Sequence, residues 1–108
     1  MSIGIVAAIL LAAGQPALKA ESGLQAQAKV SYQAAQKAAL AKVKGAAIKS
    51  AELEQEGGKL IYSLDLKQKG HSGIEEVHVD ATTGEVISVD HEGPGAEATE
   101  RAQDRQQK

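Results

Sequence analysis

The spacing of apolar residues changes abruptly at Gly45, and this change restricts the fold more than any other feature of the sequence. Before Gly45, the residues Ala35, Ala39 and Val43 recur at helical spacing. After it, apolar residues alternate with polar ones at the two-residue spacing of a strand. A helix followed by strands predicts an α+β fold, with one N-terminal helix packed on an antiparallel sheet of about four strands.

The predicted helix has recognisable ends. Ser31 is placed to cap its first turn, and Val30 lies just outside the cap as a hydrophobic staple. Leu40 and Ala47 widen the apolar stripe, and Gly45 is predicted to end the helix. Because the stripe consists mostly of small side chains, the helix can lie close to a sheet but buries little area per turn.

A first hairpin is predicted around Gly57-Gly58, because two adjacent glycines can adopt the positive φ values of a tight turn. This turn predicts three cross-strand pairs, which are Glu56 with Lys59, Leu53 with Tyr62, and Ala51 with Leu64. The pairing gathers apolar side chains on one face of both strands, and that coherence favours the register.

A second hairpin is predicted within residues 75–90, where two registers compete. A four-residue loop, Ala81 to Gly84, pairs Val79 with Val86 and scatters the apolar residues over both faces. A three-residue loop with a left-handed bulge at Gly84 instead gives two apolar pairs, Val79 with Ile87 and Val77 with Val89. The second register is the predicted one, because it collects the branched residues on a single face.

The first twenty residues are predicted to be a signal peptide. An apolar run of eleven residues, Ile3 to Ala13, has the length of a signal-peptide core and is too short for a stable transmembrane span. Pro16 breaks any helix, and a cleavage point is expected before Glu21. No Lys or Arg precedes the run, so retention as a membrane-surface anchor and burial as a helix of the domain are the alternatives.

The rest of the chain divides by composition into three parts. Residues 21–29 are polar, lack an apolar stripe and are predicted to be a linker. Residues 30–91 contain the helix and the strands and form the predicted domain. Residues 92–108 contain no large apolar residue and are predicted to be a disordered tail.

Charge and composition exclude several classes of protein. The net charge of −2 and the presence of only two aromatic residues argue against nucleic-acid binding, which uses basic surfaces and stacking aromatics. The absence of cysteine excludes disulfides, thiolate metal ligands and cysteine nucleophiles. The core must therefore consist of aliphatic side chains, and a domain of this size is expected to be marginally stable.

Three stretches of the sequence resemble the PepSY family, named for the propeptides of secreted peptidases and the YpeB protein. They are the helix from Val30 to Gly45, the hairpin AELEQEGGKLIYSLDL from Ala51 to Leu66, and EEVHVDATTGEVISVD from Glu75 to Asp90. The last is the most specific, through its V-D-A-x-T-G-E-V motif. The resemblance implies a helix on an antiparallel sheet, a periplasmic or secreted location, and the binding or inhibition of a peptidase. Since the sequence contains no peptidase domain, inhibition is expected to act in trans.

No catalytic site and no cofactor are predicted. The Ser, His and Asp residues lie on exposed strand positions or loops, and no nucleophile elbow or phosphate-binding loop occurs. Glu76, His78 and Asp80 share one strand face and are weak candidates for a metal site with nitrogen and oxygen ligands. A solvated strand face of mixed polar residues is the alternative, and we favour it.

The predicted function is therefore binding, with a secreted or periplasmic peptidase or another envelope protein as the expected partner. A single helix covers one face of a sheet, which leaves the other face for the partner. The predicted open face contains Glu52, Glu54, Ile61, Ser63, Asp65, Glu76, His78 and Ser88. Its polar character predicts moderate, salt-sensitive binding. The alternative function is the binding of a metal or small ligand by the His, Asp and Glu side chains of this face.

Overall fold

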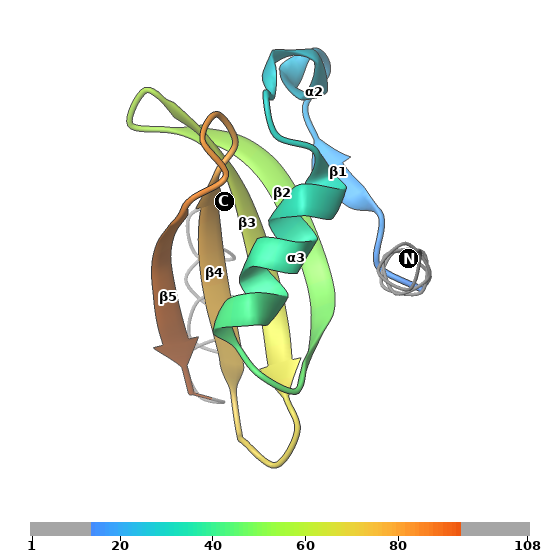
Figure 1. Ribbon diagram of the computed structural model, residues 1–108, viewed down its shortest axis with the longest axis vertical. Coiled ribbons are helices and arrows are strands. Elements are labelled where there is room, and N and C mark those ends of the chain that lie inside the picture. The colour runs from blue at the N-terminus through green and yellow to red at the C-terminus, as the bar shows by residue number, and fades with distance from the viewer. Residues whose placement is uncertain (1–13, 94–108) are drawn as a thin grey trace, which may run out of the picture.

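A mixed five-stranded sheet with a helix packed on one face makes up residues 14–93, the part of the chain that the computed structural model describes (Figure 1). The elements are β1 (Leu18–Ala20), α2 (Leu24–Gln27), α3 (Tyr32–Lys42), β2 (Ala46–Glu56), β3 (Lys59–Gln68), β4 (Ile74–Asp80) and β5 (Val86–Glu92). The strands are ordered β1-β2-β3-β4-β5, with β1 parallel to β2 and the other neighbours antiparallel. The α+β class is confirmed, with one more strand and one more helix than predicted.

The two additional elements, β1 and α2, precede the predicted helix. Both are very short, with three and four residues, so neither contains enough residues to show a periodic apolar pattern. Leu18 of β1 and Leu24 of α2 nevertheless pack against the hydrophobic core. Of the predicted signal peptide (1–20) and the predicted tail (92–108), residues 1–13 and 94–108 lie outside the described residues. The described remainder contains β1 and, at Glu92, the last residue of β5.

Helix α3 begins as predicted. The Ser31 hydroxyl oxygen accepts a hydrogen bond from the backbone N–H of Ala34 at 3.1 Å, which satisfies one of the free donors at the helix start. Ala35 and Ala39 are completely buried against the sheet. No helix among residues 14–93 is long and apolar enough to cross a bilayer.

The end of α3 differs from the prediction. The helix ends at Lys42, and Gly45, with φ of 69°, lies in the reversal that leads into β2. Ala47 is an exposed residue of β2, so its assignment to the helical stripe was wrong. A glycine in the left-handed region lets the chain turn back onto the sheet without steric strain.

The β2–β3 hairpin has the predicted register, including the pairs Leu53 with Tyr62 and Ala51 with Leu64. Gly57 and Gly58 both have positive φ values, as the turn requires. Strand β2 extends beyond the predicted pairs to Ala46, and a register shift between Ile48 and Ser50 leaves Lys49 without a cross-strand partner. This bulge keeps Ile48 buried although it is separated from the next buried residue by three positions.

The β4–β5 hairpin combines features of both competing registers. A four-residue loop, Ala81–Gly84, is closed by hydrogen bonds from the Gly84 N–H to the Asp80 carbonyl and from the Asp80 N–H to the Glu85 carbonyl, both 2.8 Å long. Gly84 has the predicted positive φ, at 83°. The bulge lies farther along, between the pairs Val79 with Val86 and His78 with Ser88, so that Val77 still pairs with Val89.

The predicted pairing of Val79 with Ile87 was therefore wrong, whereas the predicted pairing of Val77 with Val89 is confirmed. Val77 and Val79 are completely buried, whereas Ile87 and Val89 are 44% and 42% exposed. Helix α3 lies over β2, β3 and β4, and β5 is an edge strand outside its cover (Figure 1). Burial of the apolar side chains thus decreases toward the β5 edge.

The core lies between α3 and the sheet, and Tyr62 is its largest side chain. Tyr62 is 2% exposed, and its hydroxyl donates a hydrogen bond to the Val30 carbonyl at 2.6 Å. Its ring stacks on that of Tyr32, with 6.2 Å between the ring centroids. Tyr62 therefore joins the centre of the sheet to the segment that leads into α3.

Candidate functional site

The candidate site is the face of the sheet opposite α3. Cross-strand pairing places Glu52, Ser63, His78 and Ser88 in one row across β2, β3, β4 and β5. The next row contains Asp65 beside Glu76. The residues predicted for the open face are therefore brought together by the register of the sheet, although they lie far apart in the sequence.

Ile61 is the exception within this set, since it is only 5% exposed and offers almost no surface to a partner. It lies on the central strand β3, between Glu54 of β2 and Asp80 of β4. A side chain on a central strand has a cross-strand neighbour on each side, and these neighbours reduce its exposed surface. The expectation that Ile61 is an exposed apolar residue was therefore wrong.

His78 lies at the centre of a cluster of acidic side chains. Its Nε2 atom is 3.4 Å from Glu76 Oε1, and the His78 side chain is only 16% exposed. On the other side, atoms of Glu54, Glu56 and His78 able to bind a metal lie within 4.8 Å of one another. Glu56 was not among the predicted site residues, although the alternation Glu52, Glu54, Glu56 would have placed it on this face.

Asp80 has a different role from the one considered for it. Its Oδ1 atom accepts hydrogen bonds from the backbone N–H groups of Thr82 at 2.7 Å and Thr83 at 3.2 Å. These bonds stabilise the β4–β5 loop, as Asp side chains commonly do at the start of a turn. Residues of β2, rather than Asp80, thus complete the group around His78.

The environment of Glu54 makes its ionised form unfavourable. Partial burial raises the pKa of its carboxyl group, and the nearby carboxylates of Glu52, Glu56 and Glu76 raise it further. His78 lowers the pKa of Glu54. The centre of this face therefore carries more negative charge than its single histidine can balance.

We expect Glu54→Gln to stabilise the domain near neutral pH. The pKa of Glu54 is higher in the folded than in the unfolded protein, so ionisation of Glu54 destabilises the folded state. This destabilisation is present at a pH above the folded-state pKa and is lost as the pH falls below it. Urea unfolding at about pH 7 and about pH 4 should show a gain for the variant that shrinks at the lower pH.

Glu85→Gln is the matched control for this measurement, because Glu85 is exposed in the β4–β5 loop region. The control should show no comparable gain at either pH. A Glu54→Gln variant that is less stable than the wild type near neutral pH would contradict the electrostatic description of the cluster.

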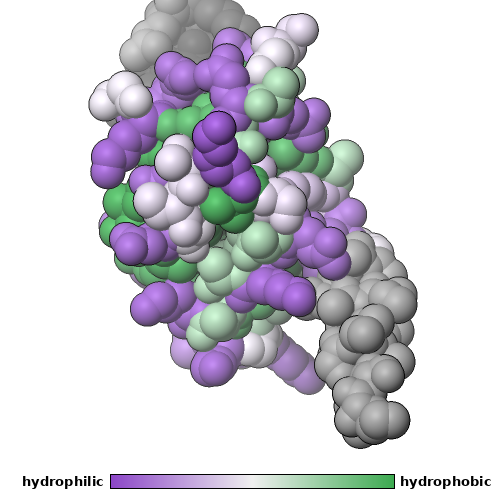
Figure 2. Space-filling view, turned by 45° about the horizontal axis from the view of Figure 1, so that its top comes forward, coloured by the Kyte–Doolittle hydropathy of each residue, from purple (hydrophilic) through white to green (hydrophobic). Residues whose placement is uncertain are grey.

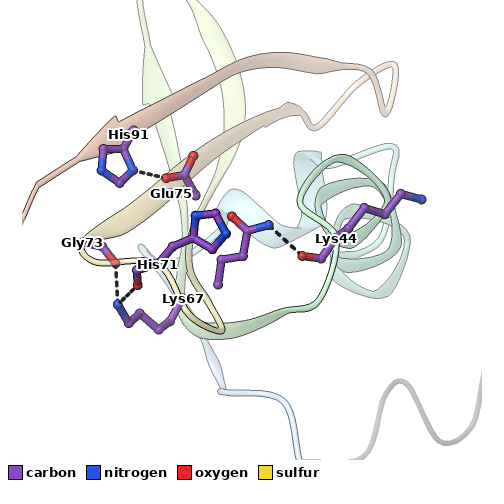
Figure 3. A network of polar contacts seen from close by, with 7 residues as sticks. Lys44, Lys67, His71, Gly73, Glu75 and His91 are labelled. Carbon is purple, nitrogen blue, oxygen red and sulfur yellow. Dashed lines mark hydrogen bonds and ion pairs between the residues drawn. The ribbon is translucent and has the colours of Figure 1, made fainter.

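The other two histidines lie at the end of the sheet that carries the β3–β4 loop, where His91 pairs with Glu75 and His71 is part of the loop (Figure 3). His91 of β5 contacts the Glu75 carboxylate through its Nδ1 atom. The Lys67 ammonium group donates to the His71 carbonyl and, at 3.2 Å, to the Gly73 carbonyl. Gln68 donates to the Lys44 carbonyl at 2.9 Å. These contacts hold the loop and the start of β2 in place.

Comparison with known proteins gives one family. The model of the PepSY domain, described as "Peptidase propeptide and YPEB domain", matches residues 29–90, which is more than half of the chain. This range includes α3, β2, β3 and β4 and most of β5. Searches of curated proteins and of solved structures gave no significant match.

Proposed function

The chain belongs to the PepSY family, and from this premise we propose that it is a non-catalytic, exported binding module that binds or inhibits a secreted or periplasmic peptidase in trans. PepSY domains are in general propeptide-like or inhibitor-like modules without chemistry of their own, and they are typical of exported proteins. The family match over residues 29–90 is the observation that carries the proposal.

The chemistry of the sheet face supports a polar protein surface as the partner. Glu52, Glu54, Glu56 and Glu76 all lie on or beside the rows that cross this face. Lys19 of β1 pairs with Glu52 at the edge of this face, whereas the exposed residues Lys37, Lys42 and Lys44 lie on α3 or directly after it, on the other side of the sheet. The acidic face therefore favours a partner with a basic surface, and such binding weakens as salt is added.

Within residues 14–93, the exposed large hydrophobic side chains are Ile87 and Val89 of the edge strand β5. Figure 2 views the molecule from the side that carries α3, where hydrophilic and hydrophobic side chains are interspersed. Interfaces that form and separate reversibly have this polar character, whereas obligate ones bury larger apolar areas. This surface is consistent with an inhibitor that binds a separately folded enzyme.

The proposal is tested by incubating the purified protein with peptidases secreted by the same organism and following peptide hydrolysis. We expect micromolar protein to inhibit, bind or protect at least one of these peptidases. If it affects none of them, the inhibitor function must be abandoned.

A second candidate function is the binding of a divalent metal ion, which the proximity of Glu54, Glu56 and His78 favours. Two carboxylates and an imidazole suit zinc and similar ions. Isothermal titration with divalent metals distinguishes the two functions. A metal site predicts a heat of binding that disappears in the variant His78→Gln, whereas a solvated acidic face predicts no saturable binding.

We also expect the N-terminal segment to be removed during export, because an apolar run of eleven residues ends near a plausible cleavage point. Mass spectrometry of the protein from its own host should then find a chain that begins near Glu21. Recovery of the chain from Met1 in the membrane fraction would contradict this expectation.

A further inference from the structure

The outer edge of β2 is covered for only a small part of its length. Strand β2 has eleven residues, and the three residues of β1 pair with it in parallel. The register joins Leu18 to Ala51, Lys19 to Glu52 and Ala20 to Leu53. Most of this edge therefore extends beyond its only partner strand in the described part of the chain.

The segment that covers the edge has one apolar side chain that reaches the core. Leu18 packs against the hydrophobic core, while Lys19 and Ala20 are exposed. Before β1, the Tyr32 hydroxyl donates a hydrogen bond to the Pro16 carbonyl at 2.6 Å. A three-residue strand with one inward apolar side chain adds little stability, so it is suited to exchange with a competing strand.

A hollow adjoins the point where β1 ends. Its volume is about 460 Å³, and it is lined by Lys19, Ala20, Glu21, Leu24, Glu52, Leu53, Glu54 and Gln55. The hollow thus continues along β2 in the direction in which a longer parallel strand would run. It provides room for side chains that β1 itself does not supply.

We propose that the outer edge of β2 is a docking site for an extended segment of a partner polypeptide, which adds to the sheet parallel to β2. Residues 18–20 occupy this site as an internal substitute for that segment. Main-chain hydrogen bonds would supply affinity, and the alternating side chains of the added strand would supply specificity.

The internal strand indicates the chemistry of the segment that fits. An apolar residue is needed opposite Ala51, where Leu18 reaches the core. A basic residue suits the next position, opposite Glu52, as Lys19 does. The third position faces Leu53 and the hollow, where Ala20 leaves space for a larger apolar side chain.

The predicted cleavage point before Glu21 lies directly after β1, so cleavage there would remove the internal strand and free the edge.

The docking site rests on the proposed function in one respect, which is that the partner is a polypeptide. Its test uses a peptide and no peptidase, so the docking site can fail or succeed independently of the inhibitor function.

The test is a titration of the full chain, followed by the amide signals of β2 in NMR spectra. The probe is a synthetic peptide of residues 14–20, and the protein variant is Leu18→Asp, which removes the inward apolar contact of β1. We expect the peptide to shift the signals of Ser50–Gln55 in this variant. The peptide should bind the wild type at least about tenfold more weakly than it binds this variant. The reason is that the attached strand β1 competes for the edge at an effective concentration in the millimolar range.

Ala17→Asp is the matched control, since it introduces the same charge at an exposed position one residue earlier. It should behave like the wild type, and a probe peptide that itself carries Leu18→Asp should not bind. The inference is overturned if the probe shifts no signal of Ser50–Gln55 in the Leu18→Asp chain, or if it shifts those of Val86–Glu92 on the opposite edge instead.

Two further measurements keep the test decisive. If Leu18→Asp does not fold, the milder variant Tyr32→Phe removes only the hydrogen bond to Pro16 and should bind the peptide more tightly than the wild type does.

Size-exclusion chromatography examines the second possible occupant, another copy of this chain. A stable dimer that depends on Leu18 would show strand exchange between copies and would contradict a partner polypeptide as the occupant.

Discussion

Replacing Tyr62 with alanine is expected to destabilise the domain by about 3–5 kcal/mol, the usual range for a buried aromatic side chain replaced by alanine. Tyr62 is 2% exposed, stacks on Tyr32 and donates a hydrogen bond to the Val30 carbonyl. A domain of this size has a total stability of about 5–15 kcal/mol, so the loss is a large fraction of it. Urea unfolding followed by circular dichroism measures the effect.

Tyr62→Phe separates packing from hydrogen bonding. It keeps the buried ring and loses only the bond to Val30, so a cost of about 0.5–1.5 kcal/mol is expected. If the alanine variant were no less stable than the phenylalanine variant, the ring would not be the central packing element that the structure indicates.

Gly73→Ala is expected to have the second large effect. Gly73 has φ of 82°, which is unfavourable for any residue with a Cβ atom, and an added Cβ would lie 2.2 Å from the backbone carbonyl oxygen of Glu92. The first factor costs about 1–2 kcal/mol. The overlap adds about 1–3 kcal/mol, since backbone on both sides would have to move.

Gly70→Ala is the matched control for this prediction. Gly70 lies in the same loop with φ of 80°, but an added Cβ there meets nothing within 4 Å. Its cost should therefore be only that of the backbone conformation, about 1–2 kcal/mol. Equal unfolding free energies for the two variants would show that the close approach of Gly73 to Glu92 does not constrain the domain.

The β2–β3 hairpin was predicted correctly because its turn residues and its alternation of apolar residues indicate the same register. Two glycines in the turn and an uninterrupted alternation allowed only one register that buries Leu53 and Tyr62 together. The cap at Ser31 was predictable for the same reason, since a cap depends on residues within one helical turn.

Bulges limited the prediction elsewhere. A bulge at Lys49 moves the apolar residue Ile48 out of the alternating pattern, so no cross-strand pair before Ala51 was predicted. In the second hairpin, the sequence favoured one bulge at the turn glycine, whereas the bulge lies at Val86 and Ile87. Such a shift depends on how the strands pack and twist as a unit, which the alternation of residues does not describe.

The candidate site was predictable in its outline and not in its detail. Alternation gave the face that carries Glu54 and His78. Glu56 of β2 and His78 of β4 come close to each other across β3, which lies between their strands. The order of the strands in the sheet sets this distance, and the sequence pattern does not reveal that order. Strand β1 was missed because three residues pair with a distant strand in parallel, which leaves no local signal.

The central claim is that the acidic sheet face binds a partner peptidase, and a comparison of two charge reversals tests it most directly. Glu52→Lys reverses a charge on the face, whereas Lys37→Glu reverses a charge at an exposed position of α3, on the other side of the sheet. Affinity for a peptidase captured from the exporting organism should be measured for both variants at low salt, after their folding has been checked. We expect Glu52→Lys to weaken binding about three- to tenfold and Lys37→Glu to leave it unchanged. Equal affinities for the two variants would contradict binding through this face.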